Sequence, residues 1–193
     1  MAPPRDMDNE VGEAISAFKS GRPVMIYDSD YREMETDLLW HAAAATPEVI
    51  RRLRNDCGGL LFLAIGNEIG EMFGLPWLQD IHSHKSLIEE NPVLSHLVTN
   101  DLQYDSRSAF TLSLNHRETY TGITDRDRSL TTRRFGELSG ELIVRGEDGA
   151  RAKERLGKEF RTPGHIPVCR ESPGGLKTRQ GHTELAVSIA RLA

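Results

Sequence analysis

The hydrophobic and polar positions along the chain follow two different periods, which predicts a domain built from both helices and strands. Val11, Ile15 and Phe18 fall on one helical face, and Gly21 predicts the end of that helix. Residues 23–27 follow at once, and their apolar run predicts a short buried strand. The chain therefore opens with a helix and a strand, and its first dense polar stretch comes directly after that strand.

The central part of the chain continues this mixture. Thr46 is placed to cap a second helix, with Pro47 in its first turn. The run over residues 60–65 is apolar without alternation, which predicts a strand buried on both faces. Residues 66–74 then predict a short helix, and apolar and polar residues alternate over 110–114 as in a half-exposed strand.

The last third contains elements of both kinds as well. Residues 141–144 predict a strand, and residues 151–160 predict an exposed, charged helix. Residues 163–168 place Pro163 and Gly164 before His165 and Pro167 after it, which predicts turns that hold this side chain in a defined orientation. Leucine and isoleucine over residues 185–192 mark a final amphipathic helix.

Helices and strands alternate irregularly in this reading, which favours the α+β class. We expect three layers, in which a mixed, twisted β-sheet is flanked by helices. A chain of 193 residues with 38% hydrophobic residues suits one domain with a sizeable core, covering residues 1–193.

Composition excludes several classes of function. The net charge of −5 argues against a generic nucleic-acid binder or a binder of anionic membranes. The longest apolar run, over residues 60–65, is too short to span a bilayer. Cys57 and Cys169 are the only cysteines, so no disulfide framework is expected. We therefore expect a cytoplasmic protein that binds neither nucleic acid nor membrane.

Residues 28–37 carry the most concentrated polar chemistry, with five carboxylates and the single arginine Arg32 directly after the first strand. Either water and this arginine neutralise the acids, as in a solvated loop, or a cation and a substrate do so. A calcium loop of the EF-hand kind is excluded, because Glu33 stands where glycine must turn and Leu39 stands where the bidentate glutamate belongs.

A second polar cluster lies near the end of the chain. His182 and Thr183 stand at the start of the last helix, where free backbone N–H groups and the helix dipole attract anions. Arg179 beside them would suit a phosphate group. The alternative is that Thr183 is a simple N-cap and Arg179 a solvated charge.

Two further stretches carry weaker signals. The turn around Thr121 combines hydroxyls, a glycine and arginines, and would suit a phosphate or a sugar, although any polar turn before a helix has this composition. Residues 77–108 show no clear period. His82, His84 and His96 lie there without a marked third ligand, so we interpret them as surface histidines rather than metal ligands.

Several of these stretches occur together, in order and spacing, in a known family. Residues 32–37 (Arg-Glu-Met-Glu-Thr-Asp), Thr121-Gly122, residues 163–165 (Pro-Gly-His) and residues 179–184 (Arg-Gln-Gly-His-Thr-Glu) resemble the motifs of 3,4-dihydroxy-2-butanone 4-phosphate synthase, an enzyme of riboflavin biosynthesis. The resemblance runs from the first helix to the last residue.

The resemblance implies a magnesium-dependent lyase that converts ribulose 5-phosphate to 3,4-dihydroxy-2-butanone 4-phosphate and releases formate, with manganese as an alternative metal. It also implies a homodimer with active sites near the interface. By the same likeness, Glu33 and His182 are expected to hold the metal, and Asp28 or Asp30, together with His165, to take part in catalysis. The expected substrate contacts are Arg32, Glu33, Asp37, Thr121, Arg179, Gly181, His182 and Thr183.

The chemistry of that reaction suits these residue types. Removing a proton beside a ketone leaves an enediolate charge, which a Lewis-acidic magnesium ion stabilises. Magnesium takes few protein ligands and keeps its other positions for water and substrate oxygens. The later steps need proton transfers, which carboxylates and histidines with different pKa values provide, and crowding among residues 28–37 is expected to raise some of these pKa values.

Three functions remain open from the sequence. The first is the synthase, the second a non-catalytic relative that binds a sugar phosphate, and the third an isomerase of phosphorylated ketoses. The resemblance implies a further strand with a catalytic glutamate after the last helix, whereas this sequence stops at Ala193 without a capping residue. From this we expect the catalytic domain to be truncated at its C-terminal end.

Overall fold

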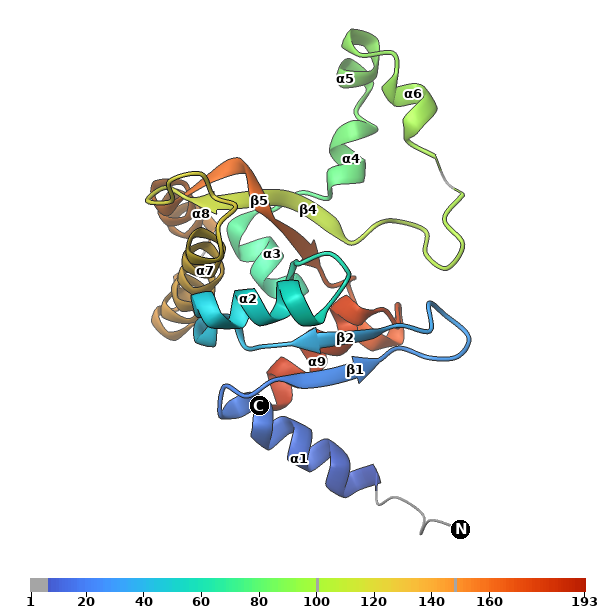
Figure 1. Cartoon of the computed structure of the whole chain (residues 1–193). Coiled ribbons are helices and arrows are strands. Elements are labelled where there is room, and N and C mark those ends of the chain that lie inside the picture. Colours follow the sequence, from blue (N-terminus) through green and yellow to red (C-terminus); the bar gives the residue numbers. More distant parts are fainter. Residues whose placement is uncertain (1–6, 100, 148) are drawn as a thin grey trace.

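The computed structural model describes residues 7–99, 101–147 and 149–193, and Figure 1 shows its arrangement of helices and small sheets. The elements follow one another in the order α1 (Met7–Lys19), β1 (Val24–Tyr27), β2 (Thr36–Leu39), η1 (Ala42–Ala44), α2 (Pro47–Asp56), β3 (Leu63–Ile65), α3 (Asn67–Phe73), α4 (Leu78–His82), α5 (Lys85–Glu90), α6 (Leu94–Leu97), β4 (Phe110–His116), α7 (Asp125–Arg145), α8 (Gly149–Glu159), β5 (Phe160–Arg170), η2 (Gly175–Lys177) and α9 (His182–Leu192).

The described strands form two sheets. Strands β1 and β2 make an antiparallel hairpin in which Ile26 pairs with Asp37. The second sheet has the order β3-β5-β4, with β3 parallel and β4 antiparallel to β5. The α+β class and the mixed sheet are confirmed, and the hairpin stands apart from that sheet.

Helix α7 supplies much of the core. Phe135, Leu138 and Leu142 repeat at helical spacing and are buried together with Ile166 and Val168 of β5. Helix α7 packs on β4 and β5, and α2 packs on α7. Helix α9 contacts β3, β1 and α1, so it joins the two sheets.

The predicted strand over residues 141–144 is wrong, because this segment is the last turn of α7. Leu142 is buried at the helical spacing from Leu138, whereas Ile143 and Val144 are exposed. The β-branched residues suggested a strand, but strand preference depends on packing, and here the buried helical face decides.

Other strand predictions need smaller corrections. Strand β1 is not buried as a whole, since the Met25 side chain is 74% exposed. Of residues 60–65 only Leu63–Ile65 form a strand, and Leu60 is exposed. Residues 163–168 are not turns: they lie within β5, which pairs with β4 across register shifts.

Several local predictions are confirmed. Thr46 caps α2, since its hydroxyl accepts the Val49 N–H, and Pro47 lies in the first turn. The helix over 66–74 is α3, which ends at Gly74 in the left-handed conformation. Helices α1, α8 and α9 and strand β4 also form where the pattern placed them.

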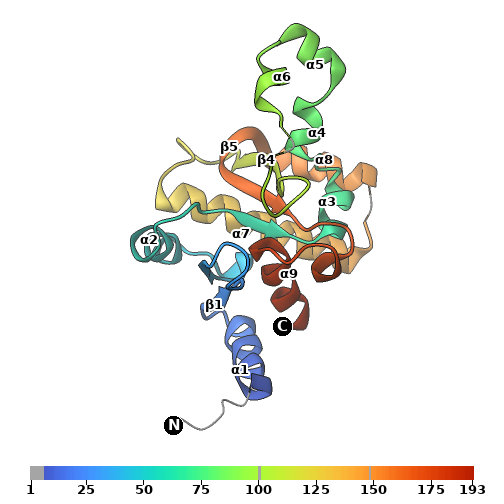
Figure 2. The same ribbon diagram turned by 90° about the vertical axis from the view of Figure 1, so that its right-hand side faces the viewer.

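Residues 78–97 form an arm of three short helices, α4, α5 and α6. The arm projects from the body in both views (Figures 1 and 2). It returns to the body through residues 101–109, where Arg107 lies over the Trp77 ring at 4.0 Å and pairs with Asp80 at 3.1 Å. In the described part of the chain, no helix combines the length and hydrophobicity needed to cross a bilayer.

Candidate active site

The acidic stretch is the loop of the β1–β2 hairpin, and Asp28 organises it. The two carboxylate oxygens of Asp28 accept the backbone N–H groups of Glu33 at 2.8 Å and Glu35 at 3.1 Å. Burial on its own raises the pKa of Asp28, but hydrogen bonds from the backbone of Glu33, Ser29 and Glu35 outweigh it, and the pKa lies below its ordinary value. Asp28 therefore stays ionised and fixes the loop. Asp30 points elsewhere and accepts the Tyr27 hydroxyl at 2.6 Å.

Glu33 and His182 meet across the site, although they are distant in the sequence. Glu33 Oε2 lies 3.3 Å from His182 Nδ1. The other ring nitrogen, Nε2, lies 3.0 Å from the Glu35 carbonyl oxygen and must donate to it. A neutral ring then directs its Nδ1 lone pair at a carboxylate oxygen, so a proton or a cation is needed between them.

These two groups and Asp28 form the cluster with metal-ligand character among the described residues, with one potential ligand atom from each within 4.8 Å of the others. We name Asp28, Glu33 and His182 the cation site. An imidazole whose second nitrogen donates to a backbone carbonyl is the usual arrangement of a metal-bound histidine, because that bond fixes the ring and its tautomer. The donor set therefore fits a divalent cation, with Glu33 and His182 as the side chains free to bind it.

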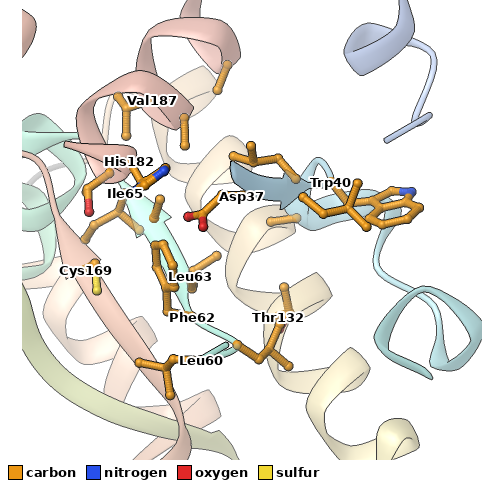
Figure 3. A pocket seen from close by; sticks show the side chains of 18 of the residues that line it. Asp37, Trp40, Leu60, Phe62, Leu63, Ile65, Thr132, Cys169, His182 and Val187 are labelled. Carbon is orange, nitrogen blue, oxygen red and sulfur yellow. The ribbon is translucent and has the colours of Figure 1, made fainter. Parts of the chain in front are cut away.

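The cation site opens into a cavity of about 1930 Å³ between the hairpin and β3. Figure 3 shows Asp37 and His182 at its polar end, with Phe62, Leu63 and Ile65 on the wall formed by β3 and the residues before it. Burial raises the pKa of Asp37; His182 opposes this rise, and nearby carboxylates add to it. The expected rise of pKa within the acidic stretch thus occurs at Asp37 and not at Asp28.

Two arginines line the same cavity beside the cation site. Arg32 Nη2 and Arg179 Nη2 donate to one oxygen of Asp105, at 2.8 and 2.7 Å. Arg32 also lies 2.9 Å from Glu33 Oε1. Arg179 Nη1 donates to Glu184 at 2.5 Å. We name Arg32 and Arg179 the arginine pair.

The start of α9 holds Arg179 in place. Gly181 is the N-cap of this helix, and a Cβ atom there would lie 2.3 Å from Arg179 Nη1. Because that guanidinium is tied to Asp105 and Glu184, a side chain at position 181 would break these bonds. Thr183 is buried in the first turn and lines the cavity, so free N–H groups of α9 lie near the arginine pair.

Glu171, directly after β5, connects α9 to the start of α3 beside the site. It accepts both Arg191 Nη groups at 2.6 Å from the end of α9, and the Asn67 backbone N–H at 3.1 Å from the start of α3. Burial raises the pKa of Glu171, but Arg191 and the Asn67 N–H outweigh it, so the pKa lies below the ordinary 4.5.

Glu171→Gln is expected to lower the free energy of unfolding at pH 7 by about 1–2 kcal/mol, a modest value because Arg191 is half exposed. The carboxylate has its lowered pKa in the folded state, so its contribution is present above pH 4.5 and is lost as the pH falls through the folded pKa. Urea unfolding of both proteins from pH 3 to pH 8 measures this. A difference that stays constant over the whole range would contradict the assignment.

His165 and Thr121 lie in a different place from the cation site. The His165 backbone N–H donates to Asn115 Oδ1 at 2.8 Å, and the Asn115 amide lies 3.1 Å from His165 Nδ1. Gly122, which follows Thr121, packs on Asn115 so closely that a Cβ would lie 2.1 Å from its amide nitrogen. We name Asn115, Thr121 and His165 the His165 cluster. It does not line the cavity.

Sequence reasoning missed four residues of this arrangement. Asp105 and Asn115 lie in stretches without a functional signal. Glu35 contacts His182 through its backbone carbonyl, and a sequence motif identifies side chains rather than backbone contacts. Glu184 stands in the recognised motif, but its spacing from Arg179 gave no reason to pair them. The histidines of the arm were interpreted as surface residues, and His84 is indeed exposed and contacts Ser86.

A cation site beside an arginine pair, at the mouth of a cavity in an α+β domain, is the arrangement expected of a metal-dependent enzyme with an anionic small-molecule substrate. Comparison with known proteins identifies the family. Residues 12–193 match the sequence model of 3,4-dihydroxy-2-butanone 4-phosphate synthase. The chain belongs to this family.

Individual relatives of similar sequence and structure belong to the same family. The 3,4-dihydroxy-2-butanone 4-phosphate synthase of Methanothermobacter thermautotrophicus is 40% identical over 183 residues, which covers 95% of this chain and 75% of the relative. That of Archaeoglobus fulgidus is 41% identical over 182 residues, covering 94% and 73%. A crystal structure of such a synthase in complex with two magnesium ions matches with a TM-score of 0.66 at 26% identity, covering 94% of this chain and 69% of that one.

Proposed function

We propose that this protein converts ribulose 5-phosphate to 3,4-dihydroxy-2-butanone 4-phosphate and formate, with magnesium as its cofactor. The observation that carries the proposal is the approach of Glu33 Oε2 to His182 Nδ1, at 3.3 Å, with the arginine pair beside them. The solved relative that holds two magnesium ions supports the choice of metal.

Each part of the site has a distinct task in this proposal. Glu33 and His182 hold the cation, and the Glu35 carbonyl fixes the ring of His182 through Nε2. When bound, magnesium supplies Lewis-acid stabilisation of the enediolate charge that forms beside the substrate ketone. Asp37 has a raised pKa and faces the cavity, so its carboxylate can take up and return a proton during turnover.

The substrate phosphate is assigned to the arginine pair and to the N–H groups at the start of α9. Arginine gives phosphate paired, charge-assisted hydrogen bonds, and a helix start adds its dipole. Thr183 lies in that first turn. The cavity exceeds the volume of a five-carbon sugar phosphate, so the substrate has room beside the cation site.

We further propose that the active enzyme is a homodimer whose partner supplies the His165 cluster. Figure 1 shows the loop after β4 and the acidic loop at opposite ends of the molecule. Both loops expose large apolar or aromatic side chains, which dimer contact would cover. These side chains are Tyr31, Met34, Tyr120 and Ile123.

Mixing two inactive variants tests the dimer. Glu33→Gln and His165→Ala are each expected to lose activity alone. After subunit exchange, mixed dimers contain one intact composite site, so an equal mixture is expected to recover about a quarter of the wild-type rate. No recovery, with subunit exchange verified by mass spectrometry, would contradict a shared site.

The reaction itself is tested by incubating the protein with ribulose 5-phosphate and magnesium and measuring formate by NMR. Formate that disappears on addition of a chelator supports the synthase. Binding of the substrate without formate would support a non-catalytic relative, and a new pentose phosphate would support an isomerase.

A further inference from the structure

Asp105 holds the position on which the two arginines converge. It lies outside regular secondary structure, in the segment that leads from the arm back to β4. One of its oxygens, Oδ2, accepts Nη2 of Arg32 at 2.8 Å and Nη2 of Arg179 at 2.7 Å. The neighbouring Tyr104 ring lies 5.9 Å from the Arg32 guanidinium. A single carboxylate oxygen thus sits where two charge-assisted donors meet.

The arginine pair offers more donors than this carboxylate uses. Among the described residues, Arg179 Nε is buried without a hydrogen-bond partner, whereas Nη1 of Arg32, a side chain only 9% exposed, is paired with Glu33 Oε1 at 2.9 Å. Buried donors of this kind are costly unless something accepts from them. A phosphate group, with three oxygens and up to two negative charges, suits the pair better than one carboxylate does.

The two acidic partners of Arg179 differ in how firmly they are held. Glu184 is fully buried in α9, and its second oxygen accepts the Ser172 backbone N–H at 2.9 Å. Asp105 reaches the arginines from the segment that carries the projecting arm (Figures 1 and 2), and its contacts are with the arginines themselves. Glu184 therefore fixes Arg179, while Asp105 is the partner that can leave.

We propose that Asp105 is a specificity-determining residue that occupies the phosphate position of the empty site and is displaced by the phosphate of the substrate. The inference rests on the proposed function only in taking the substrate to be a phosphate ester. Because Asp105 competes for the same donors, a singly charged carboxylate gains little by replacing it, whereas a phosphate dianion gains charge and hydrogen bonds. Displacement releases residues 101–109 from the arginine pair.

Binding of inorganic phosphate, measured by isothermal titration calorimetry, tests this without any turnover. Asp105→Asn keeps the shape and removes the competing charge, so we expect phosphate to bind about tenfold more tightly than to the wild type. Asp101→Asn is the matched control, because Asp101 lies on the same segment and contacts Thr99 rather than the arginines. Its phosphate affinity is expected to stay unchanged.

Several outcomes would overturn the proposal: equal or weaker binding in Asp105→Asn, the same gain in Asp101→Asn, or no binding of phosphate to either protein. A measurement on the wild type remains if Asp105→Asn does not fold. Saturating phosphate is expected to speed amide hydrogen exchange over residues 101–109, whereas slower or unchanged exchange would refute displacement. Formate release is measured separately, so failure of the synthase reaction and failure of this inference give different results.

Discussion

Replacing Glu33 by glutamine is expected to lower the rate of formate release from ribulose 5-phosphate by about a thousandfold. The carboxylate and His182 Nδ1 approach to 3.3 Å, and glutamine removes the negative charge that balances a cation there. The loss should come with a higher magnesium concentration at half-maximal rate. Steady-state kinetics over a magnesium series measures both quantities.

Glu35→Gln is the matched control for this substitution. Glu35 lies on the same loop and its side chain is exposed, while its contact with His182 is made by the backbone carbonyl, which the substitution keeps. A variant at Glu35 should therefore retain most of the activity. Equal losses of activity at the two positions would mean that the total negative charge of the loop determines the rate, and that Glu33 is not a specific ligand of the cation.

Arg179→Met is expected to cost about 3–5 kcal/mol of unfolding free energy and to abolish phosphate binding. Glu184 is fully buried, and its hydrogen bond from Arg179 Nη1 is 2.5 Å long. Without the guanidinium, the buried carboxylate keeps the Ser172 N–H as its one hydrogen-bond partner among the residues that the structure describes. Urea unfolding at pH 7 measures the loss.

The double variant Arg179→Met with Glu184→Gln separates charge from packing. Glutamine is neutral and can still accept the Ser172 N–H, so we expect most of the stability to return while phosphate binding stays lost. Arg54→Met is the surface control, since the Arg54 side chain is half exposed and its pair with Asp125 is expected to contribute much less to the free energy of unfolding than the buried pair of Arg179 does. A double variant as unstable as Arg179→Met would show that the cost comes from lost packing.

Local signals in the sequence predicted α1, α2, α3, α8 and α9, whereas α4, α5 and α6 lie in a stretch without a clear period. Thr46 with Pro47 predicted the start of α2, because a cap acts through hydrogen bonds within a few residues, and α3 ends at Gly74 within the predicted range. The strands were less predictable. Residues 141–144 have a strand composition, yet the burial of Leu142 beside Leu138 makes them helical, which depends on the tertiary contacts of α7.

The candidate site was predictable only in part, for the same reason. The family resemblance brought Glu33 and His182 together before any geometry was known, and they are neighbours in the fold. It placed Thr121 and His165 in the same site, whereas the single chain keeps them apart from the cavity. Asp105 lies in a stretch of sequence without a clear hydrophobic period. Its bonds to the arginine pair could therefore be recognised only in the folded structure.

The most direct test of the central claim is to locate a divalent cation in crystals of the wild-type protein. Manganese serves as the probe, because its anomalous scattering separates it from water. We predict an anomalous peak within bonding distance of both Glu33 Oε2 and His182 Nδ1, and its loss in Glu33→Gln. A fully occupied manganese site elsewhere on the chain, with no peak between these two side chains, would contradict the account.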